Sequence, residues 1–580
     1  MSPHAIRSVF TVGLTGLVAL APLSASAAPR VHDGVPTAEA CAALGFAPPR
    51  EDRRYRSGQM LNAPPPPHPA LALPPLPVPP VQQRSGAPRV QENVVVTGSR
   101  IAPQPGFPVS PRDTERYPNA TPNPVKRTAE EPVSTFSIDV DTASYANVRR
   151  FLNDGERPPS DAVRVEELIN YFDYGYAPPR RGQAPFAASV SIAPSPWSAE
   201  REILHIGLQG YELAASAQPP LNLVFLIDTS GSMWSEDRLP LAKKAMNVLI
   251  DQLGPEDRVS MVAYAGSAGA VLAPTAGTQK LMMRCALGAL EAGGSTAGGA
   301  GLTLAYDLAA QNFDPQAVNR VILMTDGDFN VGVADPERMK DLVMEKRRSG
   351  VYLSVYGFGR GNYNDVMMQS LAQNGNGTAA FIDTLNEAQR VLVDQLSGAL
   401  YPIADDVKIQ VEFNPAVIAE YRLIGYETRA LAREDFNNDA VDAGELGAGH
   451  SVTAIYEVTP VGSPARLTDP LRYAASDAGD VPAEVSEELG FIRLRWKEPG
   501  EDESQLIDFP ITDTDTSGTE ANFAAAIAGF GQLLRGSDFL GDWDYADAIA
   551  LATVNRGEDE FGYRFEAVQL MRLAESLSEN

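Results

Sequence analysis

The stretch LNLVFLIDTSGS, residues 221–232, decides the fold, because a continuous apolar run ends in a loop of oxygen-bearing side chains. A run such as Leu221–Ile227 is typical of a parallel strand that is covered on both faces. Asp228, Ser230 and Ser232 follow it at alternate positions, so their oxygens can point at one spot. Hard divalent cations such as Mg²⁺ prefer oxygen ligands in near-octahedral geometry. The stretch therefore predicts a buried strand with a metal site at its carboxyl end.

Residues 219–399 continue this pattern as alternating strands and helices. Further apolar runs predict four more strands, at Val259–Tyr264, Val321–Met324, Val351–Tyr356 and Ala379–Ile382. The spacing of apolar residues predicts a helix over Leu239–Leu253, which Gly254-Pro255 ends, and a second helix over Pro336–Ser349. Strands that alternate with helices of this length are typical of an α/β fold with a doubly wound parallel sheet.

Two further loops of this unit supply oxygen ligands. Asp326 comes just after the predicted strand Val321–Met324, and Thr296 ends the stretch GGST, residues 293–296, before a helix. Ligands of an open α/β sheet bind beyond the carboxyl ends of its strands. We therefore expect Thr296 and Asp326 to meet the residues that follow the first strand.

The five residues Asp228, Ser230, Ser232, Thr296 and Asp326 resemble the metal-ion-dependent adhesion site of von Willebrand factor A domains. The resemblance implies that Ser230 and Ser232 bind Mg²⁺ directly, with Mn²⁺ or Ca²⁺ as alternatives. It implies that Thr296 binds the ion directly or through water, and that Asp228 and Asp326 act mostly through waters. A partner protein's Asp or Glu would then take the open coordination position.

The resemblance extends to bacterial secreted von Willebrand A proteins of the YfbK type, over roughly residues 131–580. It also rests on three stretches: Thr135–Tyr176, Thr325–Asn330 and Asp435–His450. Some domains of this kind shift their last helix when they bind, which makes Asn386–Leu396 a candidate switch element. We expect a binding module rather than an enzyme.

Two other functions stay open on the sequence. One is a cell-envelope scaffold that its N-terminal tether recruits. The other is a metal-dependent hydrolase, in which the ion would polarise a carbonyl or phosphoryl group. No general base accompanies the metal motif, and the histidines expected in folded regions, His205 and His450, stand far from any nucleophile motif.

The chain divides into five predicted parts. Residues 1–27 are typical of a signal peptide, with Arg7 before an apolar stretch and the cleavage pattern Ala25-Ser26-Ala27. Residues 28–130 predict a disordered, Pro-rich linker, because apolar periodicity is almost missing there. An N-terminal domain at 131–218, the α/β unit at 219–399 and a C-terminal domain of strands then helices at 400–580 follow. We expect an exported protein of the periplasm or outer membrane, with no transmembrane segment after cleavage.

The regions on either side of the α/β unit contain alternating strands. Strands are predicted at 186–192 and 203–208, and again at 407–413, 421–426, 451–458 and 491–496; three helices are predicted at 521–534, 543–554 and 565–577. One interpretation pairs the strands at 186–208 with those after 400 and inserts the α/β unit into a β-rich domain. The alternative keeps the three regions as separate domains.

Both cysteines are predicted to be free. Cys41 falls in the predicted linker, and Cys285 lies in a helical pattern as a small buried residue. A disulfide framework is therefore not expected, although an exported protein would permit one.

Within the linker, Val94–Arg100 resembles the TonB-box segment of outer-membrane receptors, which would let it add as a strand to a partner's sheet. A chance Val/Thr run is the alternative interpretation. The formal net charge of −27 argues against nucleic acid and anionic membrane surfaces as partners.

Three weaker motifs are predicted to be structural. Asp139 to Thr142 partly resembles the nucleophile loop of haloacid-dehalogenase-type phosphatases, but a strand-end turn is the favoured interpretation. Gly357–Gly361 lacks the spacing of a dinucleotide loop and predicts a tight loop near the ion. Asp435–Asp439 begins like a calcium loop, but Ala440 and Leu446 stand at the positions that need Gly and Glu.

Overall fold

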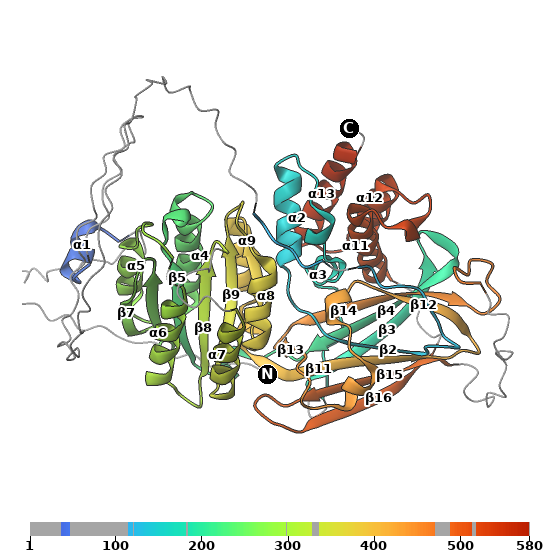
Figure 1. Cartoon of the computed structure of the whole chain (residues 1–580), viewed down its shortest axis with the longest axis horizontal. Coiled ribbons are helices and arrows are strands. Elements are labelled where there is room, and N and C mark those ends of the chain that lie inside the picture. Colours follow the sequence, from blue (N-terminus) through green and yellow to red (C-terminus); the bar gives the residue numbers. More distant parts are fainter. Residues whose placement is uncertain are drawn as a thin grey trace, which may run out of the picture.

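The computed structural model describes residues 36–46, 114–119, 121–180, 184–296, 298–327, 336–469, 488–512 and 518–578. An α/β unit lies beside a β-sandwich that a layer of helices covers (Figure 1). The predicted signal peptide at 1–27 and the segment Val94–Arg100 lie outside the described residues. Within those residues, no helix has the length and apolar character needed to cross a membrane.

The α/β unit is built on a six-stranded sheet with the order β10-β9-β8-β5-β6-β7. Its strands are β5 (Leu221–Asp228), β6 (Arg258–Tyr264), β7 (Ala268–Ala276), β8 (Val318–Thr325), β9 (Val351–Phe358) and β10 (Ala379–Ile382). The strands pair in parallel, except that β7 runs antiparallel at the edge. The predicted doubly wound parallel sheet is confirmed. The strand β7 was missed, because it is half-exposed, rich in Ala and interrupted by Pro274, so that it lacks the long run of large apolar residues that marks the other strands.

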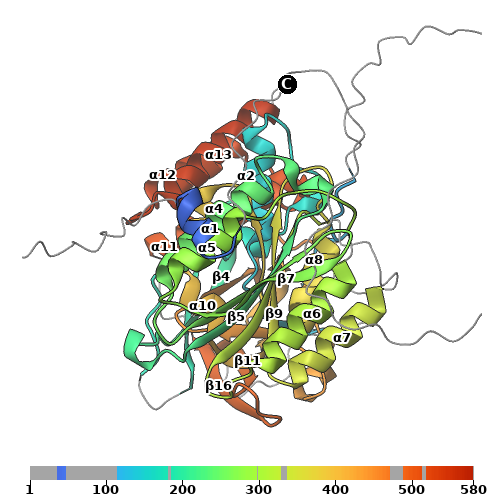
Figure 2. The same cartoon turned by 90° about the vertical axis from the view of Figure 1, so that its left-hand side faces the viewer.

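Helices cover both faces of this sheet (Figure 2). On one face lie α4 (Leu239–Gln252), α5 (Lys280–Gly288), α9 (Leu385–Gln389) and α10 (Leu396–Leu400); on the other lie α6 (Gly298–Gln311), α7 (Pro336–Arg348) and α8 (Asp365–Asn374). A single π-helical turn, Arg390–Asp394, joins α9 to α10. Because β5 is buried along its whole length between these layers, its carboxyl end is held rigidly at the rim.

The sandwich consists of two antiparallel sheets. One has the order β1-β12-β14-β4-β3. Its strands are β1 (Lys126–Arg127), β12 (Ile418–Ile424), β14 (Ser451–Pro460), β4 (Ser198–Gly210) and β3 (Phe186–Ser195). The other joins β13 (Gly444–Gly447), β11 (Pro402–Phe413), β15 (Glu488–Lys497) and β16 (Ser504–Thr512), with β2 (Val133–Ser137) also on β11. His205 of β4 stands opposite Ile455 of β14 in register. The chain therefore leaves the sandwich after β4 and returns at β11, which confirms the insertion of the α/β unit.

A layer of five helices packs on the β4–β14–β12 face. Its members are α2 (Ala143–Asn153), α3 (Val165–Ile169), α11 (Thr519–Arg535), α12 (Tyr545–Val554) and α13 (Tyr563–Ser578). Ile203, Ile424 and Ile455 from the sheet join the apolar core of this layer. The N-terminal and C-terminal regions therefore form one body, and the three predicted C-terminal helices are confirmed.

The prediction that 28–130 is an unstructured linker is wrong for its two described ends. Residues 38–43 form a short helix, α1 (Ala38–Ala43), which Thr37 caps through its hydroxyl. At the other end, the backbone N–H of Arg116 donates to Tyr363 of the α/β unit. Such segments take their order from distant partners, so apolar periodicity does not reveal them.

The prediction of two free cysteines is also wrong. Cys41 of α1 and Cys285 of α5 form a disulfide across a sequence separation of 244 residues. Both residues are buried, so Cys285 is the predicted helical core residue but not a free thiol. The pairing of two cysteines depends on their approach in space, which no local pattern encodes.

Candidate metal centre

The metal motif begins at Asp228, whose carboxylate is completely buried and held on both oxygens. Its Oδ1 accepts from the backbone N–H of Ser230 at 2.8 Å. Its Oδ2 accepts from the hydroxyls of Tyr264 at 3.1 Å and Thr325 at 3.2 Å. Burial raises the pKa of Asp228 to about 6. The carboxylate is therefore fixed in orientation at the carboxyl end of β5.

The two serines of the motif bring their hydroxyls together. Ser230 precedes a 3₁₀ turn, Gly231–Trp234, so that Ser230 and Ser232 project to the same side. Their Oγ atoms share a hydrogen bond and lie 3.0 Å apart. Two oxygens that bind Mg²⁺ at about 2.1 Å and at right angles would be about 3.0 Å apart. The spacing of the serine hydroxyls therefore fits two adjacent positions of an octahedral ion.

The loop that carries Thr296 is locked against this turn. The N–H of Gly231 donates to the carbonyl of Gly294 at 2.9 Å, and the N–H of Gly293 donates to the carbonyl of Thr229 at 2.8 Å. Thr296 itself is 7% exposed. The structure thus places Thr296 in a loop that is hydrogen-bonded to the serine turn.

Asp326 follows β8 and is completely buried. Its Oδ2 accepts from Nη1 of Arg238 at 2.8 Å. Arg238 stands at the start of α4, and the same Nη1 also donates to the carbonyl of Ser232 at 2.7 Å. This arginine therefore ties Asp326 to the serine turn. Sequence reasoning missed it, because the contact of this side chain with Asp326, 88 residues away, depends on the folded rim.

The ligand set fits a hard dication. It combines two carboxylates with three hydroxyls on loops that follow β5, β8 and α5. Among the described residues, no group of three or more His, Cys, Asp or Glu side chains could hold a metal ion. A site with only two carboxylates lies outside that pattern, and its low negative charge would leave a bound ion electrophilic.

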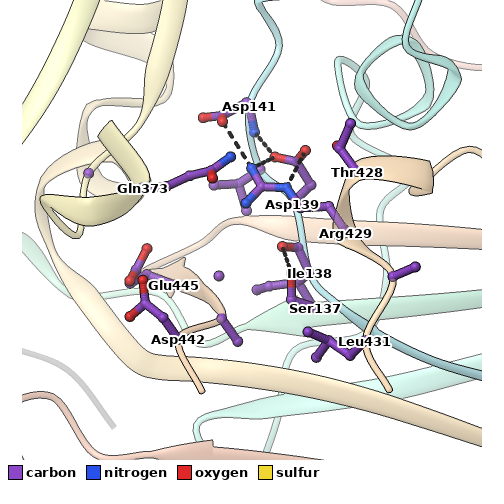
Figure 3. A pocket seen from close by; sticks show the side chains of 15 residues that line it. Ser137, Ile138, Asp139, Asp141, Gln373, Thr428, Arg429, Leu431, Asp442 and Glu445 are labelled. Carbon is purple, nitrogen blue, oxygen red and sulfur yellow. Dashed lines mark hydrogen bonds and ion pairs between the residues drawn. The ribbon is translucent and has the colours of Figure 1, made fainter. Parts of the chain in front are cut away.

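The phosphatase-like motif is structural. A cavity of about 140 Å³ lies beside it, where Arg429 approaches both of its carboxylates (Figure 3). The guanidinium of Arg429 donates to Asp139 at 2.9 Å through two nitrogens and to Asp141 at 3.2 Å. Asp141 also accepts from the N–H of Ala379 at 2.8 Å. These contacts join the sandwich to the α/β unit, so the favoured interpretation of a strand-end turn holds.

The other two weak motifs also have structural roles. The loop after β9 reaches the metal motif, because Asn362 Oδ1 accepts from Nη2 of Arg238 at 2.8 Å. In the calcium-like stretch, Asp439 pairs with Arg495 at 2.9 Å. Neither finding adds a ligand for a second ion.

Neither histidine lies near the candidate centre. His205 stands on β4, and Tyr176 contacts its Nε2 at 2.9 Å. His450 precedes β14, and its Nδ1 is buried without a hydrogen-bond partner in the described chain. Burial lowers the pKa of each imidazole to about 4, so both are neutral at pH 7.

Three family models match consecutive parts of the chain. The model described as von Willebrand factor matches residues 111–205, von Willebrand factor type A domain matches 222–395, and Uncharacterized protein YfbK, C-terminal matches 398–577. The α/β unit with the candidate centre is therefore the part that the type A model covers.

The chain is also similar to individual proteins. The chain is 44% identical over 498 residues to Uncharacterized protein YfbK of Escherichia coli (strain K12), covering 85% of this chain and 86% of the relative. It is 26% identical over 203 residues to human inter-alpha-trypsin inhibitor heavy chain H4, covering 34% of this chain and 22% of that protein. A solved von Willebrand factor type A protein from Catenulispora acidiphila is 18% identical, with a TM-score of 0.38, and the match covers 67% of this chain and 90% of that one.

A type A domain is the fold of a family of protein interaction and adhesion modules. The sequence, the sheet order and the relative of nearly equal length all lead to one assignment. The chain belongs to the YfbK family of von Willebrand factor type A proteins.

Proposed function

We propose that this protein is an exported binding protein that captures an Asp or Glu of a partner protein through a divalent cation, in the first place Mg²⁺. Ser230, Ser232 and Thr296 would hold the ion, with Asp228 and Asp326 beside it. The observation that carries the proposal is the 3.0 Å spacing of the two serine hydroxyls next to a fixed, buried Asp228.

The rim around the centre supports binding of a protein. Trp234, two residues after Ser232, is 76% exposed, which is unusual for so large an apolar side chain. Tryptophan is enriched among the residues that dominate protein interfaces. The rim thus offers an aromatic contact for a partner protein.

Export is supported by the disulfide between Cys41 and Cys285. Disulfides persist in oxidising compartments such as the bacterial periplasm and are rare in the cytosol. This agrees with the signal-peptide pattern of residues 1–27. A location in the periplasm or at the outer membrane is part of the proposal.

A binding role is favoured over hydrolysis by the surroundings of the ion site. Proton transfer in hydrolysis needs a positioned acid or base. The carboxylate of Asp228 is occupied by three donors, and Asp326 is paired with Arg238. The carboxylates of Asp228 and Asp326 are therefore both engaged in contacts that hold the centre together.

The experiment is crosslinking in cells, followed by affinity capture of the tagged protein with Mg²⁺ or with EDTA. We expect a partner that is recovered only with Mg²⁺ and is lost in Asp326→Asn. Glu434→Gln, a substitution at an exposed residue of the sandwich, is the matched control and should recover the partner normally. Identical recovery with and without EDTA would contradict the proposal.

A further inference from the structure

Arg238 makes four hydrogen bonds that connect three loops at the rim. Nη1 donates to Asp326 Oδ2 at 2.8 Å and to the Ser232 carbonyl at 2.7 Å. Nη2 donates to Asn362 Oδ1 at 2.8 Å and to the carbonyl of Arg360. The acceptors come from the loops after β5, β8 and β9. Since both terminal nitrogens are occupied by protein acceptors, the guanidinium is committed to the centre rather than to a partner.

The charge of this arginine bears directly on the ion site. The side chain of Arg238 is 14% exposed and that of Asp326 is completely buried, so water screens their interaction only weakly. The two carboxylates of the centre carry a formal charge of −2 when ionised, and the guanidinium reduces it to −1. A dication that enters the centre is therefore attracted by two charges and repelled by one.

We propose that Arg238 weakens the intrinsic hold of the centre on a divalent cation, so that the ion is retained firmly only when an anionic ligand joins it. This inference rests on the proposed function. The carboxylate of a partner would add the negative charge that Arg238 removes. By thermodynamic reciprocity, whatever the carboxylate adds to ion affinity, the ion adds to carboxylate affinity. Arg238 would thus couple occupancy of the ion to occupancy of the partner.

Two substitutions separate charge from geometry. Arg238→Gln removes the charge and keeps an amide that can donate, whereas Arg238→Lys keeps the charge and loses the planar fork. If charge governs affinity, the Gln variant binds Mg²⁺ more tightly and the Lys variant resembles the wild type. If Arg238 serves only to hold the loops in place, both variants bind more weakly.

The experiment is calorimetric titration of Mg²⁺ into the full chain, with Arg360→Gln as the matched control. Arg360 carries an exposed guanidinium at the same rim that pairs with Asp154 and Asp237. We expect the affinity of Arg238→Gln to rise roughly tenfold or more, as for removal of a like charge from a weakly screened site. The affinities of Arg238→Lys and Arg360→Gln should stay within about threefold of the wild type.

The outcomes distinguish this inference from the proposed function. A wild type that binds Mg²⁺, with an Arg238→Gln variant that binds equally or more weakly, overturns the role of Arg238 alone. Failure of both proteins to bind overturns the proposed function and this inference together. Thermal unfolding without metal checks folding: both Arg238 variants should melt cooperatively and below the wild type, because bonds between the loops are lost. Tighter binding in spite of that loss would support the electrostatic role.

Discussion

Cys41 and Cys285 join a six-residue helix near the N-terminus to helix α5 of the type A domain. The helix α1 is six residues long and is capped by one hydroxyl, and a helix this short is unstable alone. The disulfide therefore holds α1 on the domain, and a disulfide that closes a long loop contributes about 2–5 kcal/mol.

We expect Cys41→Ser to lower the free energy of unfolding by about 2 kcal/mol and to abolish amide exchange protection at residues 38–46. Hydrogen exchange with mass spectrometry measures the protection, and denaturant unfolding measures the free energy. Dithiothreitol should reproduce both effects in the wild type and change neither in the variant. Protection at 38–46 that survives the substitution would show that α1 docks without the bond.

Trp234 should report on the ion. Trp197 and Trp496 are buried and Trp543 is half-buried, whereas Trp234 stands exposed on the turn that presents Ser232. We expect addition of Mg²⁺ to change the tryptophan emission in a saturable way. The change should vanish in Trp234→Phe and persist in Trp543→Phe. If Trp234→Phe keeps the full change, the ion binds elsewhere.

Glu166 predicts a pH effect on stability. It is completely buried, and neither carboxylate oxygen has a hydrogen-bond partner in the described chain. Burial and the charges of Glu427 and Asp139 raise its pKa to about 7, above the usual value of 4.5. The folded protein thus binds the proton more tightly than the unfolded chain, and this contribution to stability is lost as the pH rises from 4.5 through 7.

We expect Glu166→Gln to stabilise the protein by roughly 1–2 kcal/mol at pH 8 and to have little effect at pH 5. Urea unfolding at pH 5 and pH 8 measures the free energy of unfolding of both proteins. The neighbouring Glu167 is the matched control, because it accepts from the N–H of Ser144 at 2.7 Å and from Gln369 at 2.8 Å. Glu167→Gln should destabilise at both pH values. An unchanged stability of Glu166→Gln at pH 8 would contradict the assignment.

His205 predicts a loss of stability in acid. Burial lowers the pKa of His205 to about 4 from the usual 6.5. Between these two pH values the unfolded chain is protonated at this histidine, whereas the folded protein is not. Stability is therefore complete above pH 6.5 and falls as the pH drops toward 4. Relative to His205→Gln, the wild type should lose about 2–3 kcal/mol between pH 7 and 4.5. If the unfolding free energies of the two proteins change with pH by the same amount, His205 does not cause the loss of stability.

The type A fold could be predicted from the sequence because each of its buried strands is marked by a short run of neighbouring apolar residues. Residues such as Leu221–Ile227 form buried parallel strands, and the carboxyl ends of those strands meet at one rim. The position of Asp228, Ser230 and Asp326 at that rim could therefore be predicted from the sequence alone. The edge strand β7, half-exposed and rich in Ala and Gly, carries no such signal.

Features that depend on distant partners could not be predicted in this way. The reach of Arg238 across three loops follows from the rotamer of a long side chain in the folded rim. The same holds for Arg429, which meets Asp139 from 290 residues away. Such contacts need the tertiary arrangement, because nothing in the local sequence marks one arginine as structural and another as exposed.

Calorimetric titration of Mg²⁺ into the wild type and the Ser230→Ala/Ser232→Ala double variant tests whether the two serines hold the ion. The matched control is Ser235→Ala, whose hydroxyl donates to Asp237 at 2.6 Å and is no ligand in the proposed centre. We predict one Mg²⁺ per chain for the wild type and Ser235→Ala, and affinity reduced at least tenfold in the double variant. Equal Mg²⁺ binding by the double variant and the wild type would contradict it.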